Sequence, residues 1–178
     1  MSTRKDESRK PDPVVEAGDE GICWVGMDLG TSRTAVSSSA GVRENTFSLV
    51  GYPKDVVSRK LLGDGPLFGA DVLKHRLSLN VYRPLEAGVI KGSDDGKDAD
   101  DNMRAARDLV RHAIRLARPG KDELVYAVIG TPAQASVKNR KAIIDAVRDE
   151  VDSVMIASEP FTVAYGLDRL TDVLVIDI

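Results

Sequence analysis

The first residues that could do chemistry lie in and after an apolar run over residues 22–27. The run predicts a buried strand, which ends at Asp28 and turns through Leu29-Gly30-Thr31-Ser32 before a second predicted strand over residues 33–37. A turn with one glycine and two hydroxyl residues presents several backbone N–H groups on one concave surface, and such a surface binds phosphate oxygens. The pattern therefore predicts a phosphate-binding turn, although an ordinary hairpin in which Asp28 caps its own turn also fits these residues.

Two further carboxylates lie at the ends of predicted elements. Asp177 ends the apolar stretch over residues 173–178, and Glu159 opens a predicted helix shortly before that stretch. Asp28 and Asp177 could each bind Mg²⁺ through water, because this ion keeps much of its hydration shell. Three carboxylates beside a phosphate-binding turn are what metal-dependent phosphoryl transfer from a nucleotide requires. The simpler alternative makes Glu159 a helix N-terminal acid and Asp177 a turn former.

The elements that must position these residues are strands and helices in alternation. The strands expected in the main sheet cover residues 22–28, 33–37, 43–50, 124–129 and 154–157. The first three have short connections and predict an antiparallel meander, which Gly51-Tyr52-Pro53 should end. The strand over residues 124–129 has no polar alternation, which predicts burial on both faces.

Four helices are expected around these strands. Their predicted extents are residues 70–79, a long helix that begins at the acidic segment 94–101 and ends before Pro119-Gly120, a helix capped by Ser136, and residues 161–170. The long helix carries an arginine stripe, defined as Arg104, Arg107, Arg111, Arg115 and Arg118. The stripe fits either a solvated face or a contact with a partner, and we interpret the neighbouring His112 as structural.

Composition excludes several classes of protein. The 178 residues carry a formal net charge of −3, which gives no electrostatic case for nucleic-acid binding. Residues 1–20 are too charged and too poor in apolar side chains to fold, so we expect a disordered tail. No apolar run approaches the roughly 20 residues that cross a bilayer, so direct membrane insertion is not expected. The single cysteine, Cys23, fits a reducing cytoplasm.

Several motifs together resemble a known family. Met-Asp-Leu-Gly-Thr-Ser-Arg-Thr at residues 27–34 resembles the first phosphate loop of the actin, MreB and heat-shock-chaperone ATPase superfamily. Ser-Glu-Pro-Phe at residues 158–161, with Val-Ile-Asp-Ile at residues 175–178, is similar to the first connecting segment and the opening of the second phosphate loop. Within the superfamily, residues 50–56 and 60–63 look most like MamK-like bacterial actins, which form the filament along which magnetosomes are aligned.

The resemblance implies ATP and Mg²⁺ as cofactors and gives particular residues a role. The cofactor-binding residues would be Asp28, Gly30, Thr31, Ser32 and Arg33. Asp28 and Asp177 would hold the waters of Mg²⁺, and Glu159 with Asp177 would form the catalytic pair that acts on the attacking water. Arg33 departs from the asparagine often found at its position; it could reach a phosphate or point to solvent.

The implied fold is α/β, the actin-type (ribonuclease-H-like) domain I, with a five-stranded mixed sheet and helices on its faces. We expect this domain over residues 21–172, a small inserted subdomain at about 51–92, and the first strand of a domain II at residues 173–178. In the superfamily the rest of the second loop and the adenosine site lie further along, so the chain would supply half of a nucleotide site. It would be a fragment or a truncated relative that does not turn over ATP by itself.

The preferred function is the N-terminal nucleotide-binding half of an actin-like ATPase that polymerises into filaments organising magnetosomes. Its partners would be further copies of itself and magnetosome-associated proteins, and its place the cytoplasmic cytoskeleton. An alternative of another class is a non-catalytic module that binds filaments or partners through the arginine stripe or the subdomain. Half of a sugar or acetate kinase is disfavoured, because no substrate-site motif is visible.

Overall fold

A computed structural model describes residues 21–92 and 99–176. The expected tail over residues 1–20, most of the acidic segment 94–101, and Asp177 lie outside the described residues. Within the described ranges no helix is long and apolar enough to cross a membrane.

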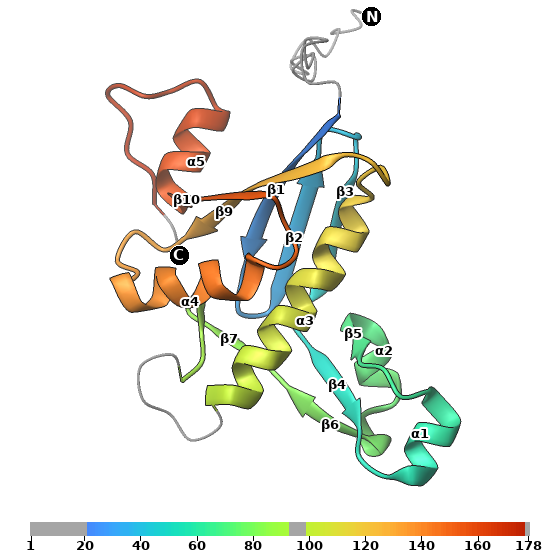
Figure 1. Cartoon of the computed structure of the whole chain (residues 1–178). Coiled ribbons are helices and arrows are strands. Elements are labelled where there is room, and N and C mark those ends of the chain that lie inside the picture. Colours follow the sequence, from blue (N-terminus) through green and yellow to red (C-terminus); the bar gives the residue numbers. More distant parts are fainter. Residues whose placement is uncertain (1–20, 93–98, 177–178) are drawn as a thin grey trace, which may run out of the picture.

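The centre of the fold is a five-stranded mixed sheet in the order β10-β9-β1-β2-β3 (Figure 1). Its strands are β1 (Ile22–Leu29), β2 (Arg33–Ser38), β3 (Arg43–Phe47), β9 (Leu124–Thr131) and β10 (Ser153–Ser158). Strands β1, β2 and β3 form the predicted antiparallel meander, whereas β9 pairs in parallel with both β1 and β10. The mixed five-stranded sheet of the predicted α/β class is therefore confirmed.

Helices α3 (Ala99–Ala117) and α4 (Val137–Val147) cover one face of this sheet (Figure 1). Along α3 the buried positions recur every three or four residues and include four alanines, Ala105, Ala106, Ala113 and Ala117, each at most 2% exposed. Small side chains at these positions let the helix approach the strands closely. The hydroxyl of Ser136 accepts a hydrogen bond from the N–H of Asn139, so the predicted cap of α4 is present.

The opposite face of the sheet is covered much less. Among the described helices, only α5 (Glu159–Gly166) lies against it, beside β9 and β10. Strand β9 consequently alternates between buried and partly exposed residues, so the prediction that it is buried on both faces is wrong. Its second row of apolar side chains, which includes Val128, instead lines an open groove.

A second, three-stranded sheet in the order β5-β4-β6 extends from the end of β3 (Figure 1). Its strands are β4 (Val50–Pro53), β5 (Leu67–Phe68) and β6 (Leu79–Tyr82), flanked by α1 (Val56–Leu62), α2 (Gly69–Lys74) and the 3₁₀ helix η1 (Arg76–Ser78). A two-stranded ribbon of β7 (Leu85–Glu86) and β8 (Val89–Ile90) then leads to α3.

This second sheet corrects two sequence predictions. Residues 43–50 do not form one strand, because β3 ends at Phe47 and the chain turns a corner at Ser48 and Leu49. Val50 then begins β4 in the second sheet. Gly51-Tyr52-Pro53 does not break the strand but belongs to β4, where a Cβ on Gly51 would lie 2.7 Å from Leu79 Cδ1. The glycine therefore permits a close approach of side chains from β6. The helix expected over residues 70–79 is divided into α2 and η1.

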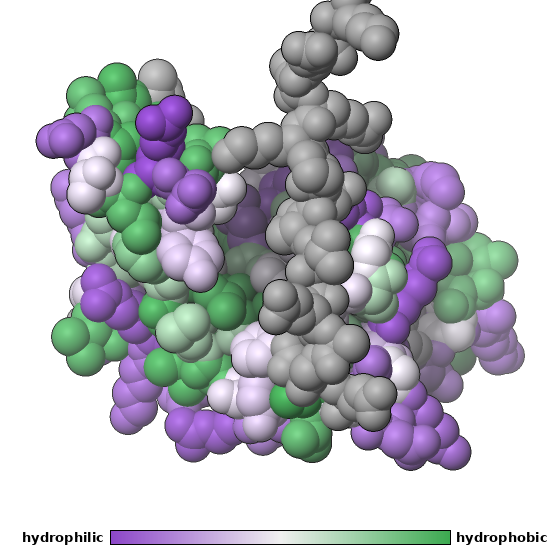
Figure 2. All heavy atoms as spheres, turned by 90° about the horizontal axis from the view of Figure 1, so that it is seen from above, coloured by the Kyte–Doolittle hydropathy of each residue, from purple (hydrophilic) through white to green (hydrophobic). Residues whose placement is uncertain are grey.

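The last described segment also differs from expectation. Residues 173–176 form no strand, and α5 ends at Gly166 rather than continuing to Leu170. A strand is stable only when its backbone groups pair with those of a neighbouring strand. None of the described strands pairs with residues 173–176. Leu170 and Leu174 are accordingly exposed, and apolar side chains gather on the side that carries α5 (Figure 2, left).

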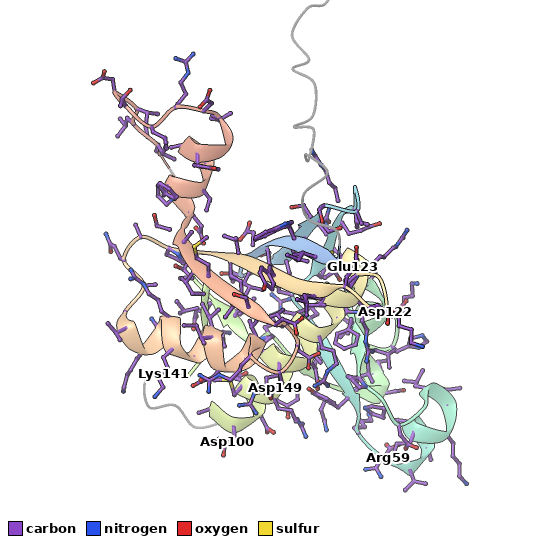
Figure 3. All side chains as sticks on the ribbon, turned by 45° about the horizontal axis from the view of Figure 1, so that its top comes forward. Arg59, Asp100, Asp122, Glu123, Lys141 and Asp149 are labelled. Carbon is purple, nitrogen blue, oxygen red and sulfur yellow. The ribbon has the colours of Figure 1, made fainter. Side chains whose placement is uncertain are left out.

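Charged side chains lie around the periphery of the described structure. Figure 3 labels Arg59, Asp100, Asp122, Glu123, Lys141 and Asp149, which project outward from several different elements. Such side chains are well hydrated and carry no argument for a site by themselves.

Candidate functional site

The turn between β1 and β2 is the first part of the candidate site. Thr31 and Ser32 are exposed at its tip, as the phosphate-binding prediction requires. A Cβ on Gly30 would lie 2.6 Å from the carbonyl oxygen of Arg33, so only glycine permits a turn this tight. The turn therefore brings exposed backbone and two hydroxyl groups close together at the end of β1.

Underneath the turn lies Ser48, a residue that the sequence interpretation did not single out. Its hydroxyl donates to the carbonyl oxygen of Gly30 at 2.7 Å, and its N–H donates to the carbonyl oxygen of Ser32 at 3.0 Å. Ser48 is 1% exposed and follows β3. Nothing in the sequence marked it, because the same residue fits the interior of an uninterrupted strand.

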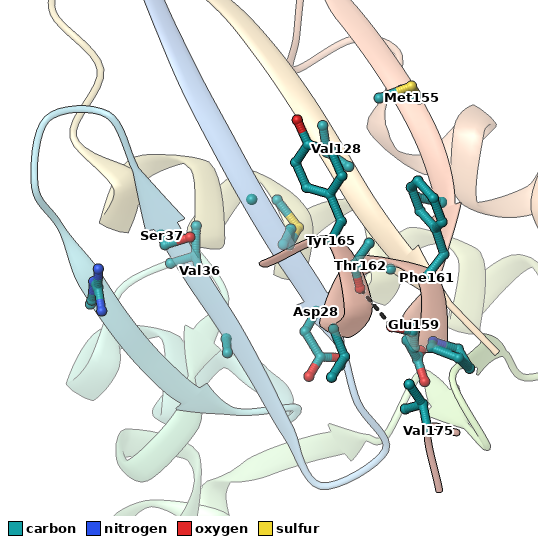
Figure 4. A pocket seen from close by; sticks show the side chains of 18 of the residues that line it. Asp28, Val36, Ser37, Val128, Met155, Glu159, Phe161, Thr162, Tyr165 and Val175 are labelled. Carbon is teal, nitrogen blue, oxygen red and sulfur yellow. Dashed lines mark hydrogen bonds between the residues drawn. The ribbon is translucent and has the colours of Figure 1, made fainter. Parts of the chain in front are cut away.

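The two described carboxylates of the prediction, Asp28 and Glu159, are brought to the same edge of the sheet. In the parallel register Asp28 pairs with Gly130 of β9, and Gly130 pairs with Ala157 of β10. Neighbouring strands are about 4.8 Å apart, so the backbones at Asp28 and Ala157 are about 10 Å apart. Glu159 follows two residues after Ala157, and both carboxylates line the same groove (Figure 4).

Two glycines lie next to the Glu159 side chain, and Gly130 is the one that makes room for it. A Cβ on Gly130 would lie 3.2 Å from Glu159 Cγ, and a Cβ on Gly88 would lie 3.6 Å from Glu159 Oε1. Gly88 has φ of +70°, a conformation that favours glycine, and it also approaches Pro132 closely. The carboxylate therefore reaches over backbone that bears no side chains, at the N-terminal end of α5, where the helix dipole favours a negative charge.

The groove itself is an open hollow of about 1210 Å³ on the less covered face of the sheet. All five strands of the main sheet contribute residues to its floor, and α5 forms one wall with Phe161 and Tyr165 (Figure 4). The hydroxyl of Thr162 donates to the carbonyl oxygen of Glu159 at 2.8 Å, which fixes the first turn of that wall. Asp28 and Glu159 lie in the same part of the hollow, and apolar side chains such as Val36, Val128 and Met155 line other parts of it (Figure 4).

The side chain of Arg33 is held by two residues of β3. Its guanidinium donates to Asn45 Oδ1 at 2.9 Å and lies 4.4 Å from the centre of the Phe47 ring. The side chain thus follows β3, and a role toward phosphate would need it to leave both contacts. Asp177, the predicted residue of the second phosphate loop, lies outside the described residues.

The residues present suit a hydrated magnesium ion better than a directly bound metal. Among residues 21–92 and 99–176 there is no cluster of three histidine, cysteine or acidic side chains that could hold an ion directly. Mg²⁺ at a nucleotide usually has one or two protein carboxylates, with water and phosphate oxygens as the remaining ligands. Asp28, exposed beside the turn, fits that lesser requirement.

The arginine stripe of α3 makes contacts within the chain. Arg111 Nε donates to Glu150 Oε1 at 2.7 Å, and the Arg104 guanidinium lies 4.3 Å from the centre of the Tyr52 ring. His112 stacks on Phe68 with 4.3 Å between ring centres, as expected of a structural histidine. At least part of the stripe therefore stabilises the packing of α3 and needs no partner molecule.

Several solved structures that match this architecture are actin-like proteins. The described structure matches the MamK double helical filament with a TM-score of 0.79 and 39% identity, over 88% of this chain and 47% of that one. It matches a non-polymerising MamK mutant bound to AMPPNP with a TM-score of 0.74 and 39% identity, over 84% of this chain and 45% of that one. MreB5 of Spiroplasma citri bound to ADP, at 20% identity and a TM-score of 0.62, shares the fold. The fold is that of the actin-like superfamily.

Curated sequences narrow the relationship. The chain is 39% identical over 155 residues to the actin-like protein MamK of Paramagnetospirillum magneticum and, over the same number of residues, to MamK of Magnetospirillum gryphiswaldense. The chain is thus a homologue of MamK over 87% of its own length, which confirms the resemblance. It spans 43% and 42% of the length of these two relatives. No protein-family model matches the chain.

Proposed function

We propose that this chain supplies the N-terminal, phosphate-binding half of an actin-like ATPase that assembles with copies of itself into cytoskeletal filaments. The observation that carries the proposal is the meeting of the Gly30 turn, Asp28 and Glu159 at one edge of the sheet. The homology to MamK supports the filament, and the AMPPNP in one related structure supports the nucleotide. From the same likeness we propose that the filaments organise magnetosomes and contact magnetosome-associated proteins.

Each residue of the site has a proposed part in this function. The backbone N–H groups and hydroxyls at Thr31 and Ser32 would bind the terminal phosphates of ATP, because they face solvent at the tip of a tight turn. Asp28 would hold the water shell of Mg²⁺, an ion that neutralises phosphate charge when bound. Glu159 would orient the attacking water, and Asp177 would assist from the second loop. Arg33 would contribute through its backbone unless its side chain leaves Asn45 and Phe47.

Because the phosphate half is what this chain provides, its ligand specificity can be tested directly. We would titrate the ¹⁵N-labelled 178-residue chain with magnesium ATP, magnesium tripolyphosphate and adenosine, and follow the backbone amides by NMR. We expect saturable shifts at residues 28–32 with both phosphate compounds, weak enough for a dissociation constant of about 1 mM. Adenosine should leave these amides unchanged.

The matched control compares Asp28→Asn with Asp122→Asn, an exposed acid remote from the turn. The first substitution should weaken the magnesium-dependent part of the shift, and the second should have no effect. Two results would exclude phosphate binding as a function of this chain. One is that the amides of residues 28–32 do not shift at a ligand concentration about 10 times the expected dissociation constant, and the other is that adenosine shifts them equally.

A further inference from the structure

Two buried hydroxyl groups lie in line beneath the tip of the β1–β2 turn. Thr34 and Ser48 are each 1% exposed, and their hydroxyl oxygens are 3.0 Å apart. Ser48 Oγ continues the line to the carbonyl oxygen of Gly30 at 2.7 Å. Val36, two residues after Thr34, and Leu49, next to Ser48, are apolar and buried, so two hydroxyls here are not required for packing.

The direction of the protons follows from counting donors. A serine hydroxyl has one proton, and a carbonyl oxygen can only accept, so Ser48 gives its proton to Gly30. The hydrogen bond between the two hydroxyls must then run from Thr34 to Ser48. The result is a hydroxyl relay, defined as Thr34 O–H to Ser48 O–H to Gly30 C=O, in which each hydrogen bond strengthens the next.

This relay controls the orientation of one peptide group. In a trans peptide the C=O of Gly30 and the N–H of Thr31 point in opposite directions. Since Ser48 holds the carbonyl toward the protein interior, the Thr31 N–H is directed to the opposite side, where the tip of the turn is exposed. The N–H of Ser48 donates a hydrogen bond to the carbonyl oxygen of Ser32, two residues after Gly30, and so stabilises the same turn.

We propose that Thr34 and Ser48 are positioning residues that preorganise the Thr31 N–H for a phosphate oxygen. The inference rests on the proposed function for its ligand, but the orientation of the peptide can be measured without any ligand. Without the relay the peptide group between Gly30 and Thr31 can rotate. Part of the free energy of phosphate binding is then used to order this peptide group, so binding is weaker.

The test uses four variants of the 178-residue chain. Ser48→Ala removes the donor to Gly30, Thr34→Val removes the first hydroxyl while keeping the shape, and Thr34→Ser restores that hydroxyl. Ser58→Ala, at a buried serine of α1 away from the turn, is the matched control. Each variant is examined by urea unfolding, by the NMR shift and hydrogen exchange of the Thr31 amide, and by titration with magnesium tripolyphosphate.

We expect Ser48→Ala to move the Thr31 amide resonance without ligand and to weaken tripolyphosphate binding about tenfold, as for the loss of one hydrogen bond. Thr34→Val should act in the same direction by about threefold, and Thr34→Ser should resemble wild type. Ser58→Ala should change neither quantity.

The inference is overturned if Ser48→Ala leaves the Thr31 amide as in wild type, or if it lowers stability while tripolyphosphate binding stays unchanged. If the wild-type chain binds no tripolyphosphate and Ser48→Ala still moves the Thr31 amide, the relay is supported and the proposed function fails.

Discussion

Replacing Gly30 by alanine tests whether the turn between β1 and β2 has the tight geometry on which the site depends. The added Cβ would lie 2.6 Å from the Arg33 carbonyl oxygen, about 1 Å inside a favourable contact between non-bonded heavy atoms. The oxygen belongs to the main chain and the Cβ is bonded directly to it, so no side-chain rotation can relieve the contact and the turn itself must open. Such overpacking costs about 1–3 kcal/mol, and alanine offsets about 0.4–1 kcal/mol by restricting the unfolded chain.

We therefore expect Gly30→Ala to lower the free energy of unfolding by about 1–2 kcal/mol. Urea unfolding followed by circular dichroism measures this change. Gly65→Ala is the matched control, because a Cβ at Gly65 meets no atom within 4 Å. That variant should be as stable as wild type or slightly more so. Equal stability of the two variants would show that the turn is wider than described.

Three further changes probe other parts of the chain. Tyr52→Phe removes a hydrogen bond of 2.6 Å to Asp108 and should lower the free energy of unfolding by about 1 kcal/mol at pH 7. Burial and this bond raise the pKa of Tyr52, so the stabilisation from the Tyr52 hydroxyl is complete below about pH 10 and is lost above it. The stability difference between Tyr52→Phe and wild type should therefore shrink above about pH 10, and a difference that stays constant would contradict the reasoning. Burial lowers the pKa of His112, so wild type should lose stability as the pH falls below about 6.5, whereas His112→Gln should show a weaker dependence in the same urea titrations. In any assembly of this chain that hydrolyses ATP, Glu159→Gln should slow phosphate release by about 10²-fold with nucleotide binding retained, and unchanged release would exclude Glu159 from the mechanism.

The sequence was sufficient for the elements whose signals are local. The apolar run before Asp28 predicted β1, and the β-branched residues after the turn predicted β2. Both predictions were possible because the burial of a strand depends on the residue types along that strand itself. The three- and four-residue spacing of apolar side chains predicted α3, and Ser136 predicted the start of α4. Short connections then sufficed for the antiparallel meander.

Local signals were insufficient where an element depends on a distant neighbour. Residues 173–176 have the composition of a strand, but composition cannot supply the partner strand that pairs its backbone. Gly51 was expected to end a strand, whereas its missing side chain admits Leu79 from β6. In both cases the sequence indicated which conformations the segment could adopt, and the tertiary contacts decided which one it adopted.

The candidate site divides in the same way. Residue types and spacing were enough to single out Asp28, Gly30 and Glu159, since carboxylates and glycine at the ends of elements are visible along the chain. Only the parallel register of β1, β9 and β10 decided that Asp28 and Glu159 share one edge. Only the corner after β3 brought Ser48 beneath the turn, because a hydrogen bond across many residues leaves no local pattern in the sequence.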